Sequence, residues 1–260
     1  FVFRSGLIMK PLFTAAKTAS RKRVIFAEGE DERVLRAAQV LIEEKIAEPI
    51  LIGRPSIIAS RLDRFGLKIR PQTDFDVVNP EDDPRFRSYV DDYFALVGRK
   101  GVIPEAARTI VRTNSTVIAA LAIRRNEADA MICGLEGRYQ KHLRDVSQII
   151  GKAPGVIEYA ALSLLIGQRG ATFLVDTSVC YDPSAEQIAA VTEMAAREIR
   201  RFGIVPRAAL LSHSDFGSRD SESAEKMRRA AAILRERDPD LEADGEMHGD
   251  SALSEILRRR

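Results

Sequence analysis

The sequence lacks the features that mark several large classes of protein. Its two cysteines are not in a CxxC spacing, which leaves a disulfide framework or a zinc site without support. No apolar run approaches the ~20 residues that cross a bilayer, and a formal net charge of +2 is too small to indicate nucleic-acid binding. We therefore expect a cytoplasmic protein in a reducing environment, with no membrane partner, no nucleic-acid partner and no metal site in this chain.

Motifs that carry known chemistry are missing as well. Neither GxGxxG nor GxxxxGK[ST] occurs, so no motif supports dinucleotide or P-loop binding. Ser212, His213 and Asp215 are too close in sequence to adopt the geometry of a catalytic triad easily, and the Gly-x-Ser-x-Gly elbow is absent. We therefore assign no catalytic residue.

Short apolar runs alternate along the chain with longer amphipathic ones, which is typical of an α/β fold with a largely parallel sheet. With 45% apolar and 30% charged residues, the 260-residue chain can bury the core of one large or two medium domains. The pattern predicts strands at 24–27, 49–52, 75–78, 128–133, 172–175 and 208–211. Helices are predicted at 31–46, 83–97, 115–124, 185–202 and 223–237, from residues 55 and 104 onward, and in the segment that ends near 151.

Proline and glycine at Pro154 and Gly155 interrupt this pattern, and the alternation of strands and helices then starts afresh. We therefore predict a first domain at 20–151 and a second domain at 152–260. The second domain is expected to be truncated at its C-terminal end.

Both ends of the chain favour a fragment of a longer protein. Residues 1–24 carry six basic and no acidic side chains, a pattern of transit peptides and of basic connectors, and we interpret 1–19 as a connector. The chain begins with Phe1 rather than Met, and its last nine residues form a helical pattern without a stop signal.

The segment from Ile132 to Leu143 follows a predicted strand and opens a predicted helix. Its two glycines let the backbone approach a ligand, and its basic side chains bring positive charge to the start of the helix. A phosphate cradle and an ordinary strand-to-helix turn both fit these residues. Cys133, at the strand end, fits either a nucleophile or a small buried apolar side chain.

Three other segments each allow a functional and a plain interpretation. The acidic residues of 28–33 suit a metal, or simply the first turn of a helix. Segment 212–218 lies just past a predicted strand, where α/β sheets bind ligands, or it is a polar turn. The carboxylates and histidine of 244–250 suit a divalent cation, but we favour a solvated loop.

Six stretches of the sequence carry a family resemblance. They are RVIFAEGEDERVL (23–35), NPEDDPRF (79–86), NEADAM (126–131), YDPSAE (181–186), RFGIVPR (201–207) and DGE (244–246). Over residues 20–257, approximately, the chain resembles the phosphate acetyl/butyryltransferase family. Within it, MKPLF (9–13), AMICG (130–134), LSHS (211–214) and DGEMHGD (244–250) resemble the C-terminal domain of bacterial multidomain NADP-dependent malic enzymes.

This resemblance implies two α/β domains with an interdomain cleft and an architecture like that of isocitrate and isopropylmalate dehydrogenases. It also implies a homo-oligomer formed through this domain, and malic enzyme domains upstream in the same polypeptide. Those domains would bind NADP and Mg or Mn and oxidatively decarboxylate malate to pyruvate.

One departure from the family pattern bears on activity. Active phosphotransacetylases carry a His-Thr/Ser-Thr-Ala-Asp-Thr sequence followed by Arg-Pro, whereas residues 135–145 read LEGRYQKHLRD. The family arginine of a Leu-Arg-Lys segment aligns with Val97, with Arg99 close by. The family's C-terminal Arg and Asp have no counterpart in this sequence. The resemblance therefore implies a domain that is silent in acetyl transfer and senses acetyl-CoA for the malic enzyme.

The acetyl-CoA site is expected to involve two loops, in which Arg138 pairs with a phosphate and Tyr139 stacks on adenine. The plain alternative places Arg138 and Lys141 at a dimer interface and Tyr139 half-buried in the core. An active phosphate acetyltransferase and a structural dimerisation module are the alternative functions. The expected ligand-binding residues are Cys133, Gly134, Gly137, Arg138, Tyr139, His142, Ser212, His213, Ser214 and Gly217.

Overall fold

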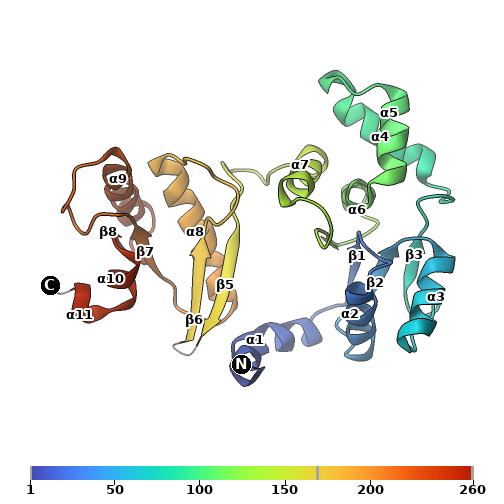
Figure 1. The fold of residues 1–260 in the computed structure, drawn as a ribbon, viewed down its shortest axis with the longest axis horizontal. Helices are drawn as coiled ribbons and strands as arrows, with labels where there is room; N and C mark the ends of the chain where they lie inside the picture. The colour runs from blue at the N-terminus through green and yellow to red at the C-terminus, as the bar shows by residue number, and fades with distance from the viewer. Residues whose placement is uncertain (1, 168–169, 259–260) are drawn as a thin grey trace. The chain divides into compact units, whose positions relative to one another are not determined.

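The computed structural model describes residues 2–167 and 170–258, so that Phe1 and the last two arginines of the expected terminal helix lie outside the described residues. The chain divides into two compact units (Figure 1). One comprises Ala15–Gly151, and the other Lys152–Arg260 together with Phe1–Thr14. Helix α1 (Val2–Thr18) occupies the segment that we interpreted as a connector.

No described helix is both long and apolar enough to cross a membrane.

A four-stranded parallel sheet forms the centre of the unit Ala15–Gly151. Its strand order is β3-β2-β1-β4, so β1 pairs with β2 on one side and with β4 on the other. The strands are β1 (Lys22–Phe26), β2 (Ala47–Ile52), β3 (Asp76–Val78) and β4 (Ala130–Ile132). Because parallel strands point the same way, the loops that follow β1 and β4 meet at one edge of the sheet.

Helices cover both faces of this sheet, as the buried side chains of adjacent strand residues show. Phe26 packs in a core with α2 and α3, whereas Ile25 packs in a separate core with α4, α5 and α6. This division follows from the two-residue period of a strand, which sends successive side chains to opposite faces. The helices of the unit are α2 (Glu32–Glu43), α3 (Pro55–Phe65), α4 (Phe86–Val97), η1 (Gly98–Lys100), α5 (Pro104–Thr113), α6 (Ser115–Arg124) and α7 (Tyr139–Ile149).

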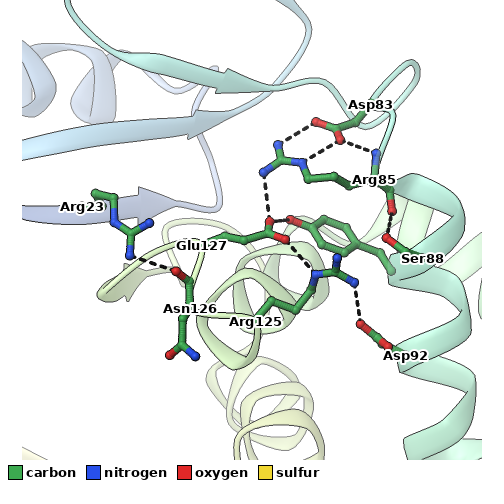
Figure 2. A network of polar contacts seen from close by, with 9 residues as sticks. Arg23, Asp83, Arg85, Ser88, Asp92, Arg125, Asn126 and Glu127 are labelled. Atoms are coloured by element: carbon green, nitrogen blue, oxygen red, sulfur yellow. Dashed lines mark hydrogen bonds and ion pairs between the residues drawn. The ribbon is translucent and has the colours of Figure 1, made fainter.

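A polar network centred on Glu127 joins α4 to the segment that precedes β4, and Figure 2 shows its members. The Glu127 carboxylate accepts hydrogen bonds from the Tyr89 hydroxyl, from Arg85 Nη1 at 2.9 Å and from Arg125 Nε at 2.7 Å. Arg85 also donates to Asp83 at 2.8 Å. Several residues that carry the family resemblance, at 79–86 and 126–131, therefore stabilise the fold.

The described residues of the other unit form two separate two-stranded sheets. In the first, β5 (Leu162–Gly167) pairs antiparallel with β6 (Gly170–Val175). In the second, β7 (Arg207–Leu211) pairs parallel with β8 (Glu242–Met247). The helices are α8 (Ala185–Arg201), α9 (Glu222–Arg237), α10 (Gly249–Leu253) and α11 (Glu255–Arg258), and a core of mainly Ala and Leu side chains joins α8 and α9 to β7.

The α/β fold class is confirmed, and each predicted strand and helix corresponds to an observed element within a few residues. The expectation of a solvated loop at 244–250 was wrong. Residues 242–247 form β8, in which Glu246 is fully buried and Met247 is 2% exposed. The acidic composition hid the strand, because Glu242 and Asp244 occupy the exposed positions of its alternation. Strand β5 had not been predicted at all.

Replacing Glu127 by Gln should lower the free energy of unfolding at pH 7 by about 2 kcal/mol, because hydrogen bonds to charged groups contribute roughly 1.5–3 kcal/mol. Burial raises the pKa of Glu127, but Tyr89 and Arg125 outweigh it and hold the pKa below the ordinary 4.5. The stabilisation is therefore present above pH 4.5 and is lost as the pH falls through the pKa of the folded state.

Urea denaturation at several pH values tests this expectation, with Glu105→Gln on the surface of α5 as the control. The control should stay within about 0.5 kcal/mol of the parent at every pH. A Glu127→Gln variant as stable as the parent at pH 7 would contradict the role assigned to the network.

Candidate functional site

The first predicted loop lies at the carboxyl ends of β1 and β4 and leads into α7. The Glu28 carboxylate, just past β1, accepts a hydrogen bond from the Gly134 amide at 2.9 Å through Oε1. Its other oxygen, Oε2, is buried and has no hydrogen-bond partner among the described residues. Glu28 thus ties the two strand ends together and sets where the loop begins.

His142 holds the middle of this loop. Its Nε2 lies 2.6 Å from the Glu136 carbonyl oxygen and its Nδ1 lies 2.8 Å from the Thr116 hydroxyl. Because a carbonyl oxygen only accepts, Nε2 donates, and in the neutral ring Nδ1 accepts from Thr116. Gly137 leaves room for this ring, since a Cβ there would lie 3.1 Å from Nε2 and its φ is +95°. Both ring nitrogens of His142 are therefore engaged within the loop.

Cys133 is half-buried and packs against the core that contains α4 and α6. Burial, reinforced by the negative charge of Glu28, raises the pKa of the thiol. A thiol with a raised pKa is a poor nucleophile. This supports the interpretation of Cys133 as a small apolar side chain.

Arg138 and Tyr139, at the start of α7, are exposed. Tyr139 is 52% exposed. Arg138 is exposed and occupies the N-cap position of α7 without a side-chain cap. Its guanidinium has no ion pair within the described part of the chain. The two side chains are thus accessible to a ligand at the helix start.

The second predicted loop follows β7 and is built on the buried carboxylate of Glu246 in β8. Its Oε1 accepts hydrogen bonds from the Ser214 hydroxyl at 2.9 Å, the Gly217 amide at 2.9 Å and Arg228 Nη1 at 2.7 Å. Burial raises the pKa of this carboxyl, but these hydrogen bonds outweigh it and the pKa is lowered. Glu246 is therefore a buried anion that fixes the conformation of the loop.

The remaining predicted residues of the second loop differ in their surroundings. The Ser212 hydroxyl is buried without a hydrogen-bond partner among the described residues, and the exposed His213 lies with Nε2 3.1 Å from the Ser221 hydroxyl. Asp215 accepts a hydrogen bond from the His248 amide at 2.7 Å, and its Oδ2 lies 3.0 Å from His248 Nδ1. Of the predicted binding residues in this loop, Ser212 and His213 therefore make no hydrogen bond to the Glu246 carboxylate, whereas Ser214 and Gly217 do.

Each unit brings together its own part of the predicted site. The residues from Cys133 to His142 gather at one sheet edge of Ala15–Gly151, whereas Ser212 to Gly217 belong to the other unit. The predicted cleft between them stays a prediction.

The acidic side chains of Asp31 and Glu30, in segment 28–33, make hydrogen bonds and ion pairs with neighbouring residues. Asp31 caps α2 by accepting from the Arg33 amide, and the Arg33 guanidinium lowers the pKa of this carboxyl to about 2. Glu30 pairs with Arg54 at 2.9 Å. Across residues 2–167 and 170–258, no three His, Cys, Asp or Glu side chains are grouped so that they could hold a metal ion.

Comparison with known proteins shows which family the chain belongs to. The sequence profile of the family described as Phosphate acetyl/butaryl transferase matches residues 7–260. The chain belongs to this family. The crystal structure of a phosphotransacetylase from Streptococcus pyogenes superposes with a TM-score of 0.85 and 26% identity, covering 98% of this chain and 76% of that one.

Relatives at the sequence level fall into two groups. The chain is 75% identical over 260 residues to an NAD-dependent malic enzyme of Rhizobium meliloti, and 49% identical over 258 residues to an NADP-dependent malic enzyme of Escherichia coli. It is 30% identical over 240 residues to a phosphate acetyltransferase of Nitratidesulfovibrio vulgaris. These matches cover 100%, 99% and 92% of the chain, but it spans only 34% of the length of each of these relatives.

Several residues that build the two loops were not predicted from the sequence to contact them. Glu28, Thr116 and Arg228 make contacts that span 18 to 106 positions along the chain, which no local pattern reveals. Glu246 belongs to the stretch DGE (244–246), which carries the family resemblance, and this was the signal from which its importance could have been predicted.

Replacing Glu246 by Ala should destabilise the protein by about 3 kcal/mol, because it leaves the partly buried Arg228 without its carboxylate and releases the loop. Asp244→Ala is the matched control, since Asp244 lies in the same strand but is exposed, and its pair with Arg235 should contribute no more than about 1 kcal/mol. Thermal denaturation compares the two variants. Equal losses of stability would show that Glu246 has no special structural role.

Proposed function

We propose that the chain is a regulatory, acetyl-CoA-binding domain of a malic enzyme and does not transfer acetyl groups. Membership of the phosphate acetyl/butaryl transferase family and the high identity to malic enzymes support this proposal. The proposed contacts are the loop residues from Cys133 to His142 and from Ser212 to Gly217.

The surface at the start of α7 is the observation that carries this proposal. Where active phosphotransacetylases are expected to present hydroxyl side chains, this chain presents the exposed Arg138 and Tyr139. A guanidinium suits a phosphate, and an exposed phenol ring suits stacking on adenine. These groups favour the nucleotide part of coenzyme A over acetyl phosphate.

In the proposed full-length protein, upstream domains oxidatively decarboxylate malate to pyruvate with a nicotinamide cofactor and Mg or Mn. The resemblance in the sequence implied NADP, but the relative with 75% identity is named as NAD-dependent, which favours NAD. We propose a cytoplasmic homo-oligomer. Acetyl-CoA would act by binding the active and the inactive state with different affinity, and we expect inhibition, because acetyl-CoA is formed downstream of pyruvate.

Two alternative functions have direct tests. An active phosphate acetyltransferase would form acetyl-CoA from acetyl phosphate and coenzyme A, and a folded protein without this activity would dismiss it. If the domain is a structural dimerisation module, its deletion should change the size of the oligomer. Acetyl-CoA should in that case have no effect on the full-length enzyme.

Replacing Arg138 by Ala should raise the acetyl-CoA concentration needed for half-maximal inhibition about tenfold or more, because a charge-assisted hydrogen bond contributes roughly 1.5–3 kcal/mol. The measurement is malate-dependent reduction of the nicotinamide by the full-length protein at subsaturating malate. Activity without acetyl-CoA should be unchanged.

Arg144→Ala is the matched control, since Arg144 is an exposed arginine on the same helix but outside the proposed site. It should leave the response to acetyl-CoA as it is. If both variants respond like the parent, Arg138 is not part of the site. If the parent itself does not respond, the sensor role is wrong.

A further inference from the structure

A groove of about 760 Å³ lies between α4 and α5 in the unit Ala15–Gly151. Figure 1 shows these two helices as neighbours. Two apolar residues line the groove: Val90 is 7% exposed, and Phe86 packs against the buried core. The polar residues that line it are Arg87 and Asp91 of α4 and Arg108, Thr109 and Arg112 of α5. None of these residues belongs to either loop of the proposed acetyl-CoA site.

The arginines of this groove have no ion pair with any described residue. They are Arg87, Arg108 and Arg112. Other arginines of the same unit are paired, such as Arg85 with Asp83 and Arg125 with Asp92. Asp91, the acidic residue of the lining, is likewise in no ion pair within the described part of the chain. Positive charge therefore exceeds negative charge in the groove, and it is not neutralised by a neighbouring carboxylate.

The positions of these arginines are unfavourable for the helices that carry them. Arg108 and Arg112 are four residues apart on α5, where like charges lie one turn from each other and repel. Arg87 lies in the first turn of α4, where the helix dipole disfavours a positive charge. The Arg112 guanidinium carbon lies 4.6 Å from the centre of the Phe86 ring, a stacking contact that orients it. An anion bound among these side chains would offset both repulsions.

We propose that the groove between α4 and α5 binds a small multivalent anion, one that carries two or more carboxylate or phosphate groups. A guanidinium binds either group through two parallel N–H···O hydrogen bonds. The Thr109 hydroxyl already donates to the Glu105 carbonyl oxygen at 3.1 Å, so the arginines are the donors that remain. The volume of about 760 Å³ lies within the roughly 300–1,000 Å³ of small-molecule sites.

Hydrogen exchange of the full-length protein, followed by mass spectrometry of its peptides, tests the proposal with two probes. Citrate represents the carboxylates and inorganic tripolyphosphate the phosphates, each compared with sodium chloride at equal ionic strength and without divalent metal. At least one probe should slow the exchange of peptides from α4 and α5 about threefold or more, because a ligand stabilises the state that binds it. The probe that acts identifies the chemical source. If neither probe changes these peptides, the proposal is wrong.

A double variant and a matched control assign the effect to the arginines. Arg108→Gln combined with Arg112→Gln should raise the half-maximal concentration of the effective probe about tenfold or more, because charge-assisted hydrogen bonds are lost. Arg64→Gln on α3 is the control, since the Arg64 guanidinium also lies over an aromatic ring, that of Phe65, at 5.8 Å. Peptides of β1 and β2 report whether each variant is folded. A folded double variant that responds like the parent would overturn the proposal.

Asp91→Asn should have the opposite effect. Removing a negative charge from the groove should lower the half-maximal concentration about threefold, because less repulsion opposes the anion. A substitution that only disturbs packing does not tighten binding, so unchanged or weaker binding would contradict the proposed position. If the double variant speeds exchange of α4 and α5 without a probe, while both probes leave the parent unchanged, an acidic protein segment occupies the groove and a small anion does not.

Discussion

Burial of the parallel sheet on both faces is the constraint on which the unit Ala15–Gly151 depends. A parallel sheet requires a cover on each face, and the helices supply it: Ile25 and Phe26, neighbours in β1, enter different cores. Because β1 lies between β2 and β4, its position is fixed from both sides. The loop at Gly134 is placed by this pairing, since Glu28 reaches it from the end of the neighbouring strand.

Much of the fold could be predicted from local periodicity, and the exceptions have physical causes. Helix α6 was predicted with its observed bounds, and α5 begins at the predicted proline. Strand β8 was missed because a buried carboxylate contradicts the usual apolar pattern. Glu246 tolerates burial only because Ser214 and Arg228 reach it from 32 and 18 positions away, a relation that no window of sequence contains.

The positions of the two candidate loops were easier to predict than the contacts of their side chains. Glycine spacing at a strand end predicted the first loop, where Arg138 and Tyr139 are exposed, and their role in binding stays a prediction. His142 is not free to bind a ligand through both ring nitrogens, because Nδ1 is hydrogen-bonded to the hydroxyl of Thr116, which is buried on α6. Tertiary partners decide which of these polar groups stay available, and a single sequence does not show them.

The network around Glu127 has a consequence for how members of this family are recognised. Asp83, Arg85 and Glu127 lie in two of the stretches by which the chain resembles its relatives, and they hold α4 against the segment before β4. These contacts stabilise the fold whatever the loops bind. A search pattern built on these two stretches would therefore collect proteins with different ligands alike, and the residues after Gly134 are the ones to compare when such proteins are sorted by chemistry.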